Sequence, residues 1–421
     1  MRPRLFAAFL ILALPAFAGR QRAVHSPSPP PAAGPTFSRD IAPIFQQHCQ
    51  SCHHTGDIAP FPLVTQSDAK PNAFLIKIMT QTRQMPPWKA AEGCGEFLDE
   101  RRLSDAEIAT IGAWVDAGAP EGNPADLPPA KEFPSEWALG TPDLVLSSEV
   151  DYTPPPQTDT YRCFTMPTNL VGDKWVAAVD THPGDRSTVH HVISFIDTTG
   201  ASVALDEAEA GPGYTCFGDP GFTATSTLGG WAPGSRPLEL PDGVAFSLPA
   251  GARVVLQVHY HPHDHDPVAD RTQIGVYFSD DPSPKEMRVL PIINQDFTIP
   301  PNASQYAVDA VFPLLIPFPL KIWFVAPHMH LLGKTMKVEM TPRNGAPQCL
   351  IEIDDWDFNW QGTYRYVTPI DVPIGAKLSL RATYDNSSDN PRNPNTPPKP
   401  VSWGESTTDE MCIAFLGVTI E

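Results

Sequence analysis

Basic residues are scarce in this sequence. The chain of 421 residues contains 29 Lys and Arg against 48 Asp and Glu, which gives a formal net charge of −19 at pH 7. A surface with this excess of negative charge repels the phosphate backbone of nucleic acids. The composition therefore argues against a nucleic-acid partner.

Long apolar runs are also missing beyond the first residues of the chain. Arg2 and Arg4 precede an apolar run at residues 5–14, and a small-x-small pattern follows at residues 16–18. This order is typical of a secretory signal peptide, and the run is shorter than the roughly 20 residues of a spanning helix. We therefore predict a signal peptide at residues 1–18 and no stable membrane insertion. The mature protein is expected to be exported, and periplasmic in a Gram-negative source or otherwise secreted.

Cysteine is sparse as well, yet two of the seven cysteines fall in one motif. Cys49 and Cys52 belong to the run QHCQSCHH, which contains C-x-x-C-H. In an exported chain this pattern is typical of covalent haem c, with two thioethers from the cysteines and an axial imidazole from His53. The weaker alternative is a chance zinc or thiol redox pair.

The residues around this motif indicate helices. Residues 40–45 lead into the motif, and Ser104 is placed to cap a second, amphipathic helix. These two features resemble the class I cytochrome c domain, which we place at residues 37–120. The resemblance implies a methionine on a later loop as the second axial ligand, and Met85, followed by two prolines, matches it. Met79 is the competing candidate, but it lies in an apolar run that favours packing.

Proline-rich segments divide the chain. Residues 19–36 and 121–136 are predicted to be extended linkers. The 50 prolines are otherwise spread between apolar runs, which is typical of short strands joined by rigid turns. Beyond the second linker, short valine-rich runs predict antiparallel sandwiches. The region is too long for one small sandwich, so we predict two, at residues 137–284 and 285–421.

Histidines gather at three places in this β region. The eight residues are His190, His191, His259, His261, His263, His265, His328 and His330. Because side chains alternate across a strand, His328 and His330 lie on one face, as two ligands of one metal would. His190 and His191 point to opposite faces of a regular strand, so a shared metal there requires that the strand bulge or end. His263 and His265 follow a proline and are predicted to lie in a solvated loop.

Histidine alone does not identify the metal, because imidazole binds zinc, copper, nickel and iron. Met411, near the C-terminus, would add a thioether that selects Cu(I). Considered by itself, Met411 is better explained as a core residue. Likewise, the adjacent pair His190 and His191 is equally compatible with a surface position, whereas an H-x-H pair on a strand favours a metal.

Four motifs occur in the order known from one family. STVHHV, LQVHYH, PHMHLLGK and TTDEMC, with TDTYRCF upstream, resemble the copper type II, ascorbate-dependent monooxygenases in order and spacing. That family includes peptidylglycine α-hydroxylating monooxygenase and dopamine β-monooxygenase. The resemblance covers approximately residues 140–421. It implies two antiparallel, jelly-roll-like sandwiches, each of which carries one copper at a solvent-filled cleft.

The resemblance also implies the copper ligands. Those of the electron-transfer copper are His190, His191 and His259. Those of the catalytic copper, which binds dioxygen, are His328, His330 and Met411. Gln257 and Tyr161 are candidates for partners of the first copper site, since Gln257 shares a strand face with His259 and Tyr161 matches a family tyrosine.

Two further implications of the resemblance concern disulfides and substrate. The family pattern pairs Cys163 with Cys216 and Cys349 with Cys412, and it leaves Cys94 over. Peptide-amidating relatives bind a substrate carboxylate with an Arg, an Asn and a Tyr. The matching residues in this chain are Ala326, Ile413 and Phe415. We therefore expect a less charged substrate than a glycine-extended peptide.

These patterns together predict an exported haem c and copper monooxygenase. It would hydroxylate a C–H bond of a small organic substrate with O₂, and electrons would pass from the haem to two copper ions. The expected upstream donor is a redox protein or an ascorbate-like reductant. The alternative is an electron-transfer, oxygen-reducing or copper-binding protein without an organic substrate. The predicted fold class is multidomain, with a small all-α cytochrome c domain followed by two all-β antiparallel sandwich domains.

Overall fold

The computed structural model describes residues 34–133, 137–156, 158–261, 266, 268–312 and 316–421. The predicted signal peptide, most of the first linker, His263 and His265 lie outside the described residues. Among the described residues, none of the helices combines the length and the apolar character that a membrane crossing requires.

Short helices dominate the described residues before the β region. The helical elements are η1 Phe37–Ile41, α1 Ala42–His48, α2 Gln66–Ala69, η2 Lys70–Asn72, α3 Ala73–Gln81, α4 Asp105–Asp116, η3 Pro124–Asp126 and, later, α5 Ala201–Ala208. The helix start expected at Ser104 is confirmed, because its side chain accepts from the Glu107 amide in a capping box. Phe37, Phe45 and Trp114 form the aromatic centre of a small core in this region.

The predicted fold class is wrong in its first part. Helices α1 to α4 have only 4 to 12 residues, and the chain between α3 and α4 adds to a β-sheet instead of closing an all-α cytochrome c domain. The amide of Ala91 donates to Glu352 O over 2.7 Å, and the amide of Leu98 donates to Arg365 O over 2.8 Å. The segment before α4 therefore belongs to the β structure, and the protein is β-rich.

The sequence of this segment explains the difference. The prolines at residues 86–87 oppose a helix, and apolar side chains follow them. Ala90 and Phe97 are buried in the core of the C-terminal sheets. Gly95 has φ +85°, and a Cβ at this position would lie 2.7 Å from Leu350 O, so a glycine allows the close approach. Burial of apolar side chains in a neighbouring core thus outweighs the local helical context.

Strands form the rest of the described chain. The first group is β1 Leu144–Ser147, β2 Thr160–Pro167, β3 Lys174–His182, β4 Val189–Asp197, β5 Tyr214–Thr215, β6 Ser226–Trp231, β7 Leu238–Glu239, β8 Val244–Leu248, β9 Arg253–Tyr260, β10 Gln273–Phe278 and β11 Lys285–Glu286. The second group is β12 Arg288–Ile293, β13 Thr298–Ile299, β14 Tyr306–Val311, β15 Leu320–His328, β16 Gly333–Thr341, β17 Gln348–Ile353, β18 Tyr364–Val372, β19 Lys377–Tyr384, β20 Val401–Ser402 and β21 Ile413–Ile420.

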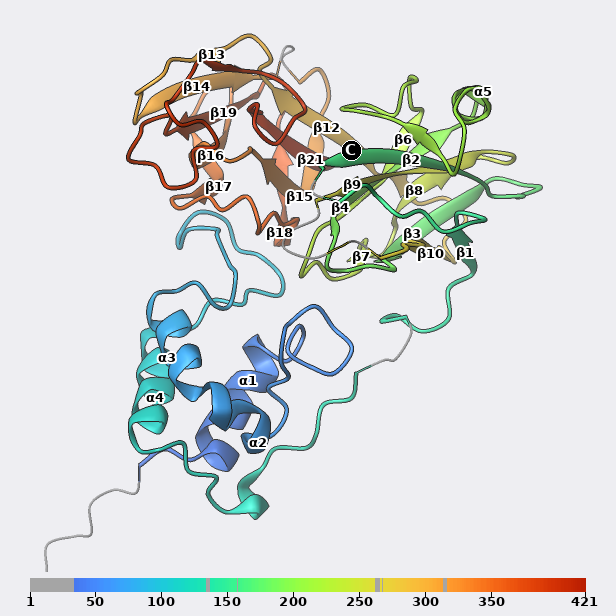
Figure 1. Cartoon of the computed structure of the whole chain (residues 1–421). Coiled ribbons are helices and arrows are strands. Elements are labelled where there is room, and N and C mark those ends of the chain that lie inside the picture. Colours follow the sequence, from blue (N-terminus) through green and yellow to red (C-terminus); the bar gives the residue numbers. More distant parts are fainter. Residues whose placement is uncertain (1–33, 134–136, 157, 262–265, 267, 313–315) are drawn as a thin grey trace, which may run out of the picture. The chain divides into compact units, whose positions relative to one another are not determined.

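The first group of strands makes two sheets around one core. One sheet has the order β1-β10-β3-β8-β11, with β7 also paired to β3, and the other has the order β5-β2-β9-β4-β6 (Figure 1). Val176 of β3 and Val258 of β9 are both fully buried members of the core that the sheets share. Strands β8 and β11 pair in parallel, so this region is not purely antiparallel as predicted.

The second group repeats this arrangement. Its sheets have the orders β12-β21-β15-β18 and β14-β19-β16-β17, and β13 pairs separately with β20. Ile322 of β15 and Val338 of β16 lie in their common core. Apolar residues alternate along β16 and β19, as expected for strands with one buried face. The predicted domain limits at residues 137–284 and 285–421 stay a prediction.

Two disulfides connect four of the seven cysteines. Cys163 pairs with Cys216 at a Cα–Cα distance of 5.7 Å, which confirms the expected bridge. The second expectation is wrong, because Cys349 pairs with Cys94 at 5.4 Å and Cys412 is a buried free thiol. The reason is the sheet-like pairing described above, which places Cys94 beside β17. Disulfides fit an oxidising compartment.

We predict that replacing both Cys94 and Cys349 by alanine lowers the free energy of unfolding. The bridge spans 255 residues, and loss of such a constraint on the unfolded chain costs about 2–4 kcal/mol. Denaturant titration under non-reducing conditions measures this difference. In the unaltered chain, peptide mapping without reduction should join Cys94 to Cys349 and leave Cys412 open to alkylation after unfolding. A peptide that joins Cys349 to Cys412 would contradict the assignment.

Candidate metal centre

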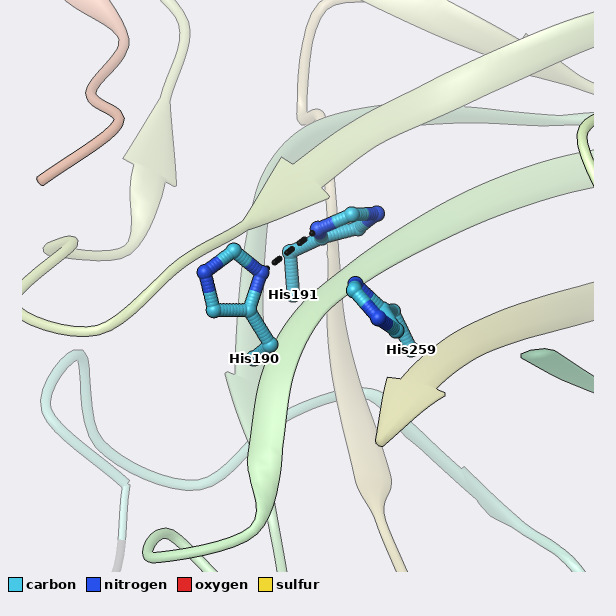
Figure 2. A group of neighbouring side chains, drawn as sticks. All are labelled: His190, His191 and His259. Carbon is cyan, nitrogen blue, oxygen red and sulfur yellow. Dashed lines mark hydrogen bonds between the residues drawn. The ribbon is translucent and has the colours of Figure 1, made fainter. Parts of the chain in front are cut away.

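Three histidines converge from neighbouring strands. His190 and His191 lie on β4 and His259 lies on β9, and their ligand nitrogens all lie within 4.8 Å of one another (Figure 2). His190 Nδ1 and His191 Nδ1 are 3.2 Å apart. The structure therefore brings together the set expected for the electron-transfer copper, and this set is called the first cluster below.

A bulge in β4 lets two adjacent histidines join one cluster. His191 pairs with His259 while Val189 pairs with Tyr260, so the register shifts at His190. A regular strand would send neighbouring side chains to opposite faces, and the extra residue of a bulge removes this conflict. A shared metal at this pair would require the strand to bulge or end, and the register shift shows a bulge.

The imidazoles of the first cluster are neutral. Burial lowers the pKa of His190 and His191 well below the ordinary value, and it lowers the pKa of His259 as well. Neutral imidazole is the form that binds a metal. His190 Nε2 and His259 Nδ1 are buried, and neither has a hydrogen-bond partner among the residues that the structure describes. This donor set fits a copper ion bound by three nitrogens.

His259 has two partners that orient its ring. Tyr161 stacks on it with a centroid distance of 4.1 Å and an angle of 9°, and the Tyr161 hydroxyl donates to Glu405 O over 3.2 Å. His259 Nε2 donates to the carboxylate of Asp159 over 3.4 Å, and His261 Nδ1 contacts the same carboxylate. A carboxylate on one ring nitrogen leaves the other for a metal. Sequence reasoning missed Asp159, although it lies within the quoted run TDTYRCF.

Gln257 has a different set of contacts from those expected. Its side-chain amide donates to Cys216 O over 2.8 Å, and it also lines the cavity described below. In the pairing of β9 with β2, Gln257 lies opposite Cys163, which is the disulfide partner of Cys216. Gln257 therefore joins the strand of His259 to this disulfide, and its role beside a copper stays a prediction.

The residues expected for the oxygen-binding copper, His328, His330 and Met411, are called the second cluster, and they lie where β15 meets β21. His328 ends β15, and its ring centroid is 5.1 Å from that of His330. His328 pairs with Ile413 across the two strands, and Met411 precedes Ile413 by two residues. The pairing of distant strands thus places Met411 on the wall of the cavity that both histidines line.

Hydrogen bonds orient the two imidazoles of the second cluster. His328 Nδ1 donates to the side-chain oxygen of Gln361, and His330 Nδ1 donates to Asp409 O over 3.2 Å. Burial lowers the pKa of His328 to about 4 and that of His330 to about 3. Each neutral ring keeps Nε2 as a ligand atom, as metal-binding histidines do. Two imidazoles and a thioether suit Cu(I).

Glu410 ties the chain after His330 to the segment that carries Met411. Its carboxyl group accepts the backbone amides of His330 over 2.9 Å, Leu332 over 2.5 Å and Met411 over 3.2 Å. The side chain is fully buried, and burial raises its pKa to about 8 despite these donors. Glu410 therefore positions two candidate ligands, His330 and Met411, at once. Sequence reasoning passed over it, although it belongs to TTDEMC.

One cavity joins the two clusters. It has a volume of about 310 Å³ and is lined by His191 of the first cluster and by His328, His330 and Met411 of the second. The ring centroids of His191 and His328 are 6.3 Å apart. The family resemblance implies a solvent-filled cleft between two copper sites, and this cavity lies between the two candidate ligand sets in the same way.

The remaining wall of this cavity is mostly apolar. Ala326, Ile413 and Phe415, which stand where amidating relatives bind a carboxylate, all line it. The described lining contains no Lys or Arg. Its single acidic residue is Glu405, whose pKa is raised to about 7 by burial and by nearby carboxylates. These walls fit an uncharged, largely apolar molecule.

A separate cavity surrounds the C-x-x-C-H motif. It has a volume of about 290 Å³ and is lined by Cys49, Cys52, His53, Met79 and Met85, among mainly apolar side chains. Cys49 and Cys52 are free thiols. His53 Nδ1 donates to a backbone carbonyl over 2.9 Å, which leaves Nε2 for a metal. The residues present fit a covalent haem, and both candidate methionines face its cavity.

Comparison with known proteins points to one family. Residues 286–417 match the sequence model of the copper type II ascorbate-dependent monooxygenase, C-terminal domain. The human putative DBH-like monooxygenase protein 2 is 24% identical over 284 residues, which cover 62% of this chain and 54% of that protein. The human DBH-like monooxygenase protein 1 is 22% identical over 357 residues, which cover 76% of this chain and 55% of that protein.

These matches support the family of copper type II ascorbate-dependent monooxygenases, and with it the class of copper-dependent oxidoreductases. The chain spans about half the length of the curated relatives that it matches. Among solved structures, the major capsid protein P2 from bacteriophage PM2 aligns with a TM-score of 0.27 at 11% identity, over 66% of this chain and 96% of that chain. A TM-score this low supports no argument about the fold.

We predict that the copper-free chain loses stability as the pH falls below 6.5. In the unfolded chain, His328 and His330 titrate near 6.5, whereas in the folded chain they titrate near 4 and 3. Between these values the unfolded chain binds more protons, so the free energy of unfolding decreases with falling pH. Urea titrations between pH 7 and about 4 test this, and a His330→Leu variant should show a shallower decrease. An unchanged slope in the variant would contradict the assignment.

Proposed function

We propose that the protein is an exported copper monooxygenase that hydroxylates a C–H bond of a small organic molecule with O₂. The observation that carries this proposal is the single cavity between His191 of the first cluster and His328, His330 and Met411 of the second. Both implied ligand sets thus contribute to the wall of one chamber, the first through His191 alone. The family match supports the same reaction class.

The two clusters would hold copper ions with different tasks. His190, His191 and His259 would hold an electron-transfer copper, since three nitrogens occupy most of its coordination positions. His328, His330 and Met411 would hold the copper that binds dioxygen, because all three line the cavity whereas only His191 of the first cluster does. When bound, copper supplies one-electron redox chemistry with O₂. In total the substrate, O₂, two electrons and two protons give the hydroxylated product and water.

The side chains of this chain orient the ligands and exclude water. Gln361 and the backbone of Asp409 hold the rings of the second cluster, and Glu410 fixes the two segments that present them. Apolar walls such as Ile413 and Phe415 keep water from a reactive centre. They also favour an uncharged substrate over a carboxylate.

We further propose that a covalent haem c supplies the electrons. Cys49 and Cys52 would form the thioethers, His53 would be one axial ligand, and Met85 would be the other. Support comes from the apolar cavity that these four residues line and from the free state of both thiols. A donor held on the same chain has a high effective concentration. A redox protein or an ascorbate-like reductant would reduce this haem in turn.

Export to a periplasm or to the outside completes the proposal. The two disulfides support it, because such bridges persist in oxidising compartments. Covalent haem c on C-x-x-C-H fits the same compartment. Residues 1–18 would act as the signal peptide.

We predict two coppers in each copper-supplied chain and one in the His328→Ala variant, because that variant lacks a ligand of the second cluster only. Elemental analysis measures the ratio. His182→Ala is a matched control, since His182 stacks on Trp137 and belongs to neither cluster.

With an uncharged substrate that the enzyme accepts, the amount of hydroxylated product should equal the amount of O₂ consumed. Peroxide with every compound tested would instead favour an oxygen-reducing protein without an organic substrate.

We predict that Met85→Ala lowers the reduction potential of the haem and slows turnover with the native donor, because a thioether ligand raises the potential. Met79→Ala is the matched control, as it removes the other methionine of the cavity. Redox titration of the visible haem bands measures the potential. Unchanged turnover and potential in Met85→Ala would rule out Met85 as the axial ligand, and a Cys49→Ala Cys52→Ala chain should lack covalent haem.

A further inference from the structure

The connection between β17 and β18 contacts the first and the second cluster and also lines the cavity of the C-x-x-C-H motif. We call residues 354–363 the Trp360 loop. Trp360 lines the same cavity as Cys49 and Cys52. A Cβ built on Gly234 would lie 3.8 Å from the Trp360 ring and 3.9 Å from Cys52 Sγ. The Arg101 guanidinium lies 3.6 Å from the same point, so the indole, the cysteine sulfur and this guanidinium surround one glycine.

The same loop reaches the first cluster through Phe358. This side chain is 4% exposed and stacks on His190 with a centroid distance of 4.4 Å and an angle of 15°. Its ring is 6.0 Å from that of His330, at an angle of 90°. Face-to-face stacking at the shorter distance makes His190 the closer neighbour. Phe358 lies two residues from Trp360 in the chain.

Hydrogen bonds hold this loop in place. Trp356 Nε1 donates to His330 O over 3.1 Å, and the Gln361 side-chain amide donates to Phe358 O over 3.0 Å. The Gln361 side-chain oxygen accepts from His328. Beside Trp360, Arg101 lines the same cavity and donates to Gly234 O over 3.0 Å. Aromatic side chains in a braced loop keep fixed distances to their neighbours.

We propose that Trp360 and Phe358 form the electron path from the C-x-x-C-H cavity to His190. The proposal rests on the haem and copper sites of the proposed function. In each transfer one electron leaves the reduced haem and arrives at the oxidised copper of the first cluster, and no bond or proton changes place. Electron transfer slows steeply as the gap between donor and acceptor widens. Two aromatic rings of one short loop lie at the two ends of this path, since Trp360 lines the C-x-x-C-H cavity and Phe358 stacks on His190. The first cluster receives the electron.

The test is a Trp360→Leu variant of the full chain, loaded with haem and copper. Under anaerobic conditions the haem is reduced in a rapid-mixing instrument, and its oxidation by Cu(II) is followed in the visible bands and by loss of the Cu(II) EPR signal. We expect oxidation at least about tenfold slower than in the unaltered chain. The reduction potentials and metal contents should not change. Trp137→Leu is the matched control, since Trp137 is also partly exposed and contacts His182 away from both clusters.

Phe358→Leu provides a second variant, in which the same slowing is expected. An unchanged rate in Trp360→Leu, with haem and both coppers present, would overturn the path. Equal slowing in Trp137→Leu would overturn it too, because the effect would then not depend on the loop. Absence of covalent haem from the unaltered chain is a different result, since it would refute the haem part of the proposed function itself.

Discussion

Burial of imidazole rings is the constraint on which both clusters depend. A buried histidine is held neutral, and each of its nitrogens needs a partner that the protein or a metal supplies. Asp159 accepts a hydrogen bond from His259, Gln361 accepts one from His328, and the backbone carbonyl of Asp409 accepts one from His330. In the first cluster, one nitrogen of each of the three rings lies within 4.8 Å of the other two. Burial lowers the pKa of these rings and keeps them neutral, and neutral imidazole is the form that binds a metal.

Two connections between distant parts of the chain position the second cluster and the segment that carries Met85. The pairing of β15 with β21 carries Met411 to the cavity that His328 and His330 line, and Glu410 accepts hydrogen bonds from the backbone amides of both His330 and Met411. The segment before α4 pairs against β17 and β18 and is bonded to Cys349 through Cys94. The chain that carries Met85 is thereby attached to the sheets that present the second cluster and the Trp360 loop.

Much of the candidate site was predictable from local patterns. The H-x-H spacing, the adjacent pair His190 and His191 with its required bulge, and the bridge from Cys163 to Cys216 all agree with the structure. Asp159 and Phe358 were missed because single polar or aromatic residues have no spacing that signals a role. The expected all-α domain was wrong because Phe97 and its neighbours are buried in a core formed by strands far along the chain.

The sequence by itself determined which side chains of this protein are candidates for binding a metal or a haem. Residue types and short spacings state which side chains can bind a metal or a haem, and they depend only on local geometry. The tertiary structure decided which of these groups meet. Cys349 pairs with Cys94 because a loop joins the edge of β17, and His191 faces His328 because two separate sheets enclose one cavity. Such contacts arise from the burial of apolar surface between distant segments, and no local pattern encodes them.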